Sequence, residues 1–260
     1  MPVQTEVYDY VARFTIRRPD LHNAFDEALI AEITAAFCRL GGEQDVRAIV
    51  LASEGKSFSA GADVHWMKRM VDYSFDENVA DAQTLADMLE AIRSCPKPVI
   101  ARVHGAALGG GVGLVAACDM AVALSSAVFC LSEVRLGIVP AVISPFVLER
   151  IGVGHARRYA LTAERFDAAE AKRIGLISEV VDTVEQLDQW IALVCGEIKK
   201  NGPEAMAVCK RILRDVPDAD WKSARELTTR TIAERRVSAE GQEGLKAFLE
   251  KRSPNWAAGD

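Results

Sequence analysis

Hydrophobic and polar residues are arranged in ways that predict strands over the first two thirds of the chain. In residues 10–16, Tyr, Ala, Phe and Ile alternate with Val, Arg and Thr. This period of two is that of a sheet strand. Residues 46–52 and 98–104 are nearly continuous apolar runs, as in strands that are mostly buried. Shorter apolar runs at 120–123 and 128–131 predict two further strands.

Helical periods lie between these strands. Over residues 26–40, apolar positions recur every three or four residues, which predicts an amphipathic helix with Asp26 available as its cap. A second helix is expected at residues 85–92. A short helix is expected at residues 143–152, with Ser144 at its cap.

After residue 180 only helical periods remain, at 183–200, 203–213, 221–237 and 239–251. No polar linker or shift in composition separates these helices from the strands. The expected architecture is an α/β core at residues 1–182, continued by a helical region at residues 183–260. The two parts are expected to form one continuous structural unit.

The charge balance argues against nucleic-acid binding. The chain has 260 residues, of which 37 are acidic and 31 basic, so the formal net charge is −6 and repels phosphate backbones. Its longest uncharged apolar stretch, residues 105–118, contains five glycines and falls short of the roughly 20 residues that a membrane span needs. Neither a nucleic-acid partner nor a membrane partner is therefore expected.

Cysteine and histidine spacing gives no metal motif. The six cysteines form no CxxC or CxxxC pair, and the four histidines form no HxH or HxxxH pair, so no metal site is expected. The first 14 residues contain neither a basic leader nor an apolar signal core, which favours a cytoplasmic protein.

Two glycine-dense loops, at residues 58–63 and 105–111, each follow a predicted strand. Glycine lets backbone N–H groups approach a ligand closely, and the second loop opens directly into a helix, whose dipole adds positive potential. Two such loops could form an oxyanion hole. The alternative is that the glycines only allow close packing of helix and strand. The dinucleotide pattern GxGxxG and the Walker motif are both absent.

Four strings together resemble the crotonase superfamily, that is, the enoyl-CoA hydratase/isomerase superfamily. They are FSAGADV at 58–64, GAALGGGVGLVAACDMAVA at 105–123, LSEVRLGIVPA at 131–141 and RFDAAEAKRIGLISEVV at 165–181. The resemblance implies a spiral of ββα turns and an acyl-CoA substrate. It also implies trimers, or hexamers made of two trimers, that assemble through the C-terminal helices. No separate cofactor is implied, because coenzyme A is part of the substrate.

The resemblance also implies the site residues. The oxyanion-hole donors are expected to be the backbone N–H groups of Ala60 and Gly110. Substrate and CoA binding is expected from the loop residues and from the C-terminal helix, at Ala60, Gly61, Ala62, Asp63, Gly110, Phe248 and Lys251. Asp119 matches a family position with a structural role. His65 and Trp66 are candidates for the acyl pocket or for simple packing.

The glutamates separate two reactions. Glu133 matches a catalytic glutamate of the family, whereas Gly113 stands where a two-glutamate hydratase has the other one. With one carboxylate, Glu133 could still hydrate an enoyl-CoA by taking a proton from water and returning it to the substrate. A Δ3,Δ2-enoyl-CoA isomerase needs only one carboxylate, because it carries a proton from C2 to C4.

The segment GIVPAVISPF at 137–146 and the C-terminal tail are similar to bacterial family members that hydrate branched glutaconyl-CoA in leucine or acyclic-terpene catabolism. A methylglutaconyl-type hydratase is therefore favoured over the isomerase. A third interpretation is a CoA-binding or RNA-binding protein without turnover. The negative charge and the lack of lysine runs weigh against RNA.

Overall fold

The computed structural model describes residues 2–257; residues 1 and 258–260, at the outer ends of the two expected ranges, lie outside the described residues. Its larger sheet has six strands in the order β1-β2-β3-β5-β7-β10. β1 and β2 form a hairpin whose turn residues, Asp9 and Tyr10, both have positive φ, as a tight hairpin turn requires. The other neighbours are parallel. The strands are β1 (Val3–Tyr8), β2 (Val11–Ile16), β3 (Ala48–Ser53), β5 (Val99–Val103), β7 (Met120–Leu124) and β10 (Glu179–Val181).

A smaller sheet repeats the connectivity of the larger one. Its order is β4-β6-β8-β9, and β4, β6 and β8 directly follow β3, β5 and β7 along the chain. Each turn of the chain thus adds one strand to each sheet before a helix returns, which is the spiral of ββα turns that the family resemblance implied. The strands of this sheet are β4 (Ser57–Ser59), β6 (Ala106–Leu108), β8 (Val128–Cys130) and β9 (Phe166–Asp167).

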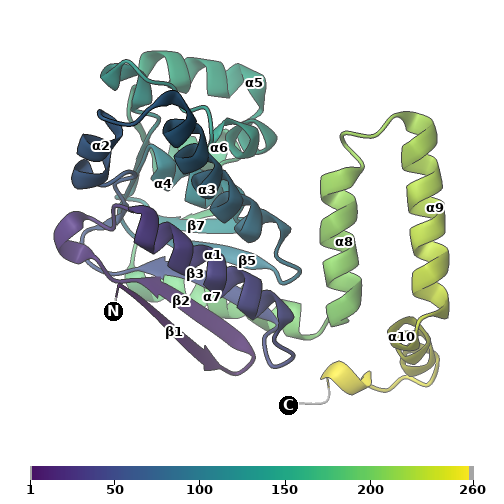
Figure 1. Ribbon diagram of the computed structural model, residues 1–260. Coiled ribbons are helices and arrows are strands. Elements are labelled where there is room, and N and C mark those ends of the chain that lie inside the picture. Colours follow the sequence, from purple (N-terminus) through teal and green to yellow (C-terminus); the bar gives the residue numbers. More distant parts are fainter. Residues whose placement is uncertain (1, 258–260) are drawn as a thin grey trace.

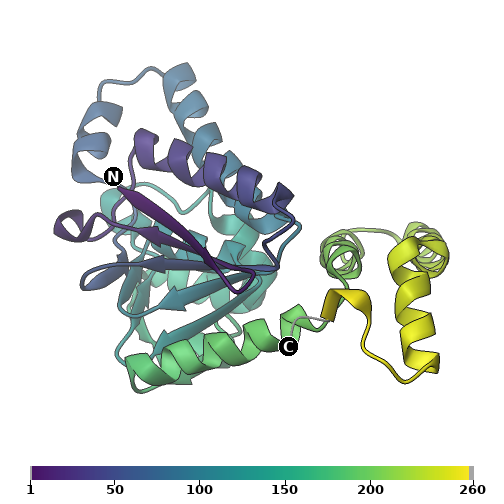
Figure 2. The same ribbon diagram turned by 90° about the horizontal axis from the view of Figure 1, so that it is seen from below.

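Helices cover both faces of the larger sheet. Figure 2 shows α1 (Glu27–Gly42) on one face and α7 (Val184–Lys199) on the other. All six residues of β3 are buried for this reason: Ile49 and Leu51 belong to the core under α1, and Ala48 and Val50 to the core under α7. The Asp26 side chain accepts a hydrogen bond from the Leu29 N–H, so the predicted helix cap is confirmed.

Along the chain, each of the remaining core helices comes after a strand of the smaller sheet. They are α2 (Val64–Met70), α3 (Phe75–Ser94), α4 (Gly110–Ala117), α5 (Ser144–Thr162) and α6 (Ala168–Arg173), with short 3₁₀ turns η1 (Pro19–Leu21) and η2 (Glu133–Leu136). The helix expected at 143–152 is longer than predicted. Gly152 leaves helical geometry with φ of 69°, but the chain resumes the helix after this kink. Ser144 is not the cap, because its hydroxyl donates to the Ala141 carbonyl just before the helix.

After α7 the chain leaves the core. α8 (Pro203–Asp215), α9 (Trp221–Val237), α10 (Ala239–Leu249) and the turn η3 (Asn255–Ala257) stand beside it as an extension (Figures 1 and 2). Because α7 packs on the larger sheet, the extension begins one helix later than residue 183. Asp119 connects α8 to the core by accepting from the Val99 N–H and pairing with Lys210 at 2.7 Å. Within residues 2–257, no helix is long and apolar enough to cross a membrane.

Candidate active site

The two glycine loops lie in direct contact. β4 overlaps the start of the first loop and β6 lies within the second, and these two strands are neighbours in the small sheet. Gly61 has φ of +84°, and a Cβ atom there would lie 2.8 Å from the Leu108 carbonyl oxygen. A Cβ atom on Gly111 would lie 2.4 Å from the Ser59 carbonyl oxygen. Both distances are too short for any residue other than glycine. The close approach of the loops is therefore built into their sequences.

The prediction that Ala60 donates to the substrate is wrong. Its N–H already donates to the His22 carbonyl oxygen at 2.9 Å, so it is not available to a ligand. The Gly61 N–H is also engaged, with the Ser59 hydroxyl at 3.2 Å. The first N–H of this loop that remains open is that of Ala62.

Ala62 owes its orientation to a bridge with Phe25. The Phe25 N–H donates to the Gly61 carbonyl at 2.8 Å, and the Phe25 carbonyl accepts from the Asp63 N–H at 3.0 Å. Because the residues on both sides of Ala62 bond to Phe25, the N–H of Ala62 points away from it. Among the described residues, no hydrogen bond from the Ala62 N–H is found.

Gly110 supplies the second open donor. It is the first residue of α4, and the first N–H groups of a helix have no acceptor within the helix. Its nitrogen lies 3.3 Å from the position that a Cβ atom on Gly61 would occupy, so it sits beside the Ala62 loop. The positive end of the α4 dipole adds to the field at this point. The prediction for Gly110 fits this geometry.

Glu133 completes the cluster at the start of η2. Its Oε1 atom lies 3.1 Å from the place that a Cβ atom on Gly109 would take, directly before Gly110. Its Oε2 atom is buried and has no hydrogen-bond partner in the described part of the chain. Burial is the main influence on this carboxyl and raises its pKa above the usual glutamate range. A partly buried carboxyl with one unpaired oxygen is suited to carry a proton.

Gly113, the position of the missing glutamate, is closed by Ile143. A Cβ atom on Gly113 would lie 2.5 Å from Ile143 Cγ2, and the Ile143 side chain is 3% exposed. The space that a second carboxylate would use is thus filled by an apolar side chain from the residue before α5. Sequence reasoning identified the absent glutamate but not its replacement.

The other predicted binding residues are dispersed. The Asp63 carboxylate is buried and accepts from the His65 and Trp66 N–H groups, capping α2, so its role toward a ligand stays a prediction. Phe248 and Lys251, at and just after the end of α10, are exposed and lie on the extension, away from α4 (Figure 1). Their part in binding CoA also stays a prediction.

Comparisons with known proteins identify the family of this chain. The family model for enoyl-CoA hydratase/isomerase matches residues 6–259. The chain belongs to the enoyl-CoA hydratase/isomerase family. A crystal structure of an enoyl-CoA hydratase from Shewanella pealeana is 41% identical, with a TM-score of 0.95 over 98% of this chain and 96% of that one. The structure of Pseudomonas aeruginosa AtuE is 35% identical, with a TM-score of 0.95 over 99% and 100%. A probable enoyl-CoA hydratase of Rhodobacter capsulatus is 34% identical over 98% of this chain and 97% of its own length.

Asn23 is a residue of this family member that sequence reasoning missed. Its side chain is fully buried and donates to the carbonyl oxygens of Glu54 (2.6 Å) and Ser57 (2.8 Å). Its side-chain oxygen accepts from the Arg18 N–H at 2.9 Å. Asn23 therefore holds the turn at residues 18–25 against the segment that leads into the first glycine loop. The signal in the sequence was an asparagine in a turn, where its positive φ of 54° is tolerated.

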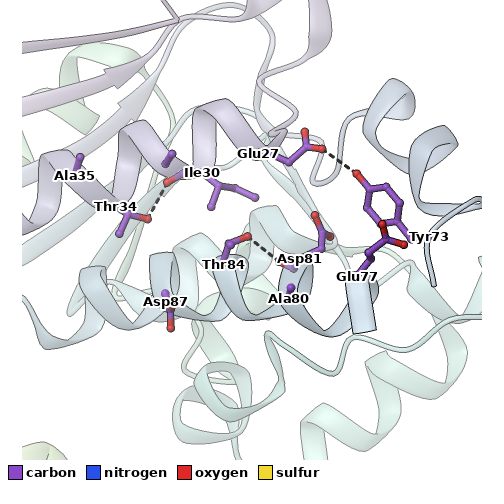
Figure 3. Close-up of a pocket in the computed structure, with 11 residues that line it drawn as sticks. Glu27, Ile30, Thr34, Ala35, Tyr73, Glu77, Ala80, Asp81, Thr84 and Asp87 are labelled. Atoms are coloured by element: carbon purple, nitrogen blue, oxygen red, sulfur yellow. Dashed lines mark hydrogen bonds between the residues drawn. The ribbon is translucent and has the colours of Figure 1, made fainter. Parts of the chain in front are cut away.

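A separate groove of about 720 Å³ runs between α1 and α3 (Figure 3). Two of its carboxylates are held by the protein. Glu27 accepts from the Tyr73 hydroxyl at 3.3 Å and pairs with Arg69, and Asp81 accepts from the Trp66 indole N–H at 2.9 Å. Trp66 is buried, which favours packing over direct contact with an acyl chain. None of the residues that line this groove belongs to the two glycine loops.

Proposed function

We propose that this member of the family is an enoyl-CoA hydratase that adds water across the 2,3 double bond with Glu133 as its single proton carrier. The observation that carries the proposal is the meeting of two open N–H donors, at Ala62 and Gly110, with the partly buried Glu133, whose Oε2 atom has no hydrogen-bond partner among the described residues. Family membership supports an acyl-CoA as the substrate.

The two N–H groups would bind the thioester carbonyl oxygen. When a nucleophile attacks C3, the electron pair of the double bond moves toward that oxygen, and the thioester becomes an enolate. Donors that are already in place stabilise this charge by several kcal/mol and need no reorganisation during the reaction. Gly110 contributes more than a single hydrogen bond, because it lies at the positive end of α4.

Glu133 would act twice, first on the water molecule and then on the substrate. As the water oxygen bonds to C3, the carboxylate takes one proton from the water. It then returns this proton to C2 of the enolate, so the product is a 3-hydroxyacyl-CoA and Glu133 is ionised again. The raised pKa of Glu133 suits this exchange, because a carboxyl whose pKa lies nearer to neutral both accepts and returns a proton readily.

An isomerase is the second candidate, and the packing of Ile143 over Gly113 favours it. With position 113 closed, no second carboxylate helps to orient water. Moving a proton from C2 to C4 of a 3-enoyl-CoA requires only Glu133 and the same two N–H donors. Both reactions pass through an enolate, so the oxyanion hole serves either one.

The proposal extends to substrate and assembly. The resemblance of residues 137–146 to branched glutaconyl-CoA hydratases supports a methylglutaconyl-like substrate of leucine catabolism, handled in the cytoplasm without a separate cofactor. A trimer or hexamer is supported by the apolar side chains that the extension exposes, namely Leu213, Trp221, Ile232, Val237, Leu245, Phe248 and Leu249. In such an assembly Phe248 and Lys251 would reach the CoA of a neighbouring subunit.

Direct assay tests the proposal. Purified protein is given crotonyl-CoA, 3-methylglutaconyl-CoA and a 3-enoyl-CoA, and the absorbance of the conjugated thioester is followed. Loss of absorbance with either conjugated substrate supports hydration. A gain with the 3-enoyl substrate alone assigns the isomerase. Binding of CoA esters or of RNA without turnover of any substrate would refute both reactions.

A further inference from the structure

The two proposed donors come from loops that are far apart in the chain. Ala62 follows β4, whereas Gly110 begins α4, nearly fifty residues later. β4 and β6 pair through only two residue pairs, and the register shifts between them, so this ladder alone fixes the loops weakly. A hydrogen-bonding pair of donors must nevertheless be placed within a few tenths of an ångström.

Phe25 contacts both loops with different parts of the same residue. Its backbone bonds to Gly61 and Asp63 and so sets the direction of the Ala62 N–H. Its ring packs on Gly110: the Cζ atom lies only 2.3 Å from the position that a Cβ atom there would take. The ring thus rests against the Cα atom of the residue that carries the second donor.

The ring itself has little freedom. Phe25 is 1% exposed, and its ring packs at an angle against Trp66, with 6.3 Å between the ring centroids. Trp66 is in turn held by the hydrogen bond from its indole to Asp81. Close-packed side chains resist displacement, so a buried ring can act as a spacer of fixed length.

We infer that Phe25 is a positioning residue that sets the separation between the Ala62 and Gly110 N–H groups, an inference that rests on the proposed function. The backbone of Phe25 holds one donor and its ring holds the other. Since these contacts join Phe25 to the two donor loops, Phe25 acts through the donors. The inference also explains why position 110 requires glycine: any side chain there would meet the ring.

Two substitutions alter the spacer and leave the backbone bridge in place. Phe25→Leu removes the Cζ atom that rests on Gly110, and Phe25→Tyr adds an oxygen at that same atom. The matched control is Phe14→Leu, because Phe14, in β2, is also fully buried and packs against another ring, Phe37, with 5.6 Å between centroids, but lies outside the turn that bridges the two loops. Melting temperatures of the variants separate lost stability from lost positioning.

The expected result is a fall in kcat of roughly 10- to 100-fold for Phe25→Leu, with KM within about threefold of wild type. Phe14→Leu should keep its kcat although it loses similar stability. A second readout is the apparent pKa at which bound acetoacetyl-CoA forms its enolate. It should rise by about one unit for each tenfold loss of oxyanion stabilisation. Equal losses of kcat in the two leucine variants, or an unchanged enolate pKa in Phe25→Leu, would overturn the inference.

A crystal structure of Phe25→Leu gives a readout that does not depend on turnover. The distance between the nitrogen atoms of Ala62 and Gly110 should differ from wild type by about 0.5 Å or more. An unchanged distance refutes the positioning role whatever the enzyme does. Absence of turnover by the wild-type protein would instead refute the proposed function, and the two failures are thereby distinguished.

Discussion

Restoring a second carboxylate at position 113 tests why this chain has one glutamate. Gly113 lies in the first turn of α4, and Gly109, the residue directly before that helix, borders Glu133. Helical side chains lean toward the N-terminus of their helix, so a glutamate at 113 would reach toward Glu133. Ile143 stands in its way, since even a Cβ atom would come within 2.5 Å of Ile143 Cγ2.

Gly113→Glu alone should therefore be destabilising. Overpacking of this kind costs about 1–3 kcal/mol. For a chain of this size that corresponds to a drop of about 2–12 °C in melting temperature. The double variant Gly113→Glu/Ile143→Ala removes the clash and gives the carboxylate room. It should recover most of that melting temperature, measured by calorimetry in parallel with the single variant.

Activity of the double variant then discriminates the two reactions. If the enzyme is a hydratase, a second carboxylate that orients water should raise hydration of crotonyl-CoA by roughly tenfold or more. If it is an isomerase, like charge beside Glu133 should lower isomerisation without producing hydration. The control is Gly113→Gln/Ile143→Ala, which has the same shape but no charge and should show no gain. A Gly113→Glu variant with wild-type melting temperature would refute the argument from Ile143.

Two further predictions concern Glu133, and a third concerns the assembly. Glu133→Gln should lower kcat by about 10²- to 10⁴-fold while KM changes little, because the oxyanion donors are backbone groups; wild-type rates on every enoyl-CoA would exclude Glu133 as the proton carrier. Burial raises the pKa of Glu133, so the folded state binds its proton more tightly than the unfolded state. The free energy of unfolding should therefore fall as pH rises through the window between the ordinary and the raised pKa, a fall that denaturant titrations should not find in Glu133→Gln. Sedimentation at micromolar concentration should give a mass well above one 28.3 kDa chain, and a monomer mass would contradict the proposed assembly.

Much of the fold could be predicted from local patterns. The strand at 98–104, the Asp26 cap and the four C-terminal helices follow from periodicity and capping, which act over a few residues, and the structure confirms them. The kink in α5 shows the limit of such rules. Gly152 does interrupt the helix, but packing of Ala156 and Tyr159 in the core carries the helix on to Thr162.

The sequence by itself, through its resemblance to the enoyl-CoA hydratase/isomerase superfamily, predicted that the two glycine loops and Glu133 carry the chemistry. Which N–H in the first loop is open was decided only by tertiary structure. Ala60 and Ala62 are equivalent as sequence, but His22 bonds to the first, and Phe25 turns the second away from itself. These pairings join residues nearly forty positions apart, and no local pattern encodes their register. The same holds at Gly113, where the deciding neighbour is Ile143, thirty residues further along the chain.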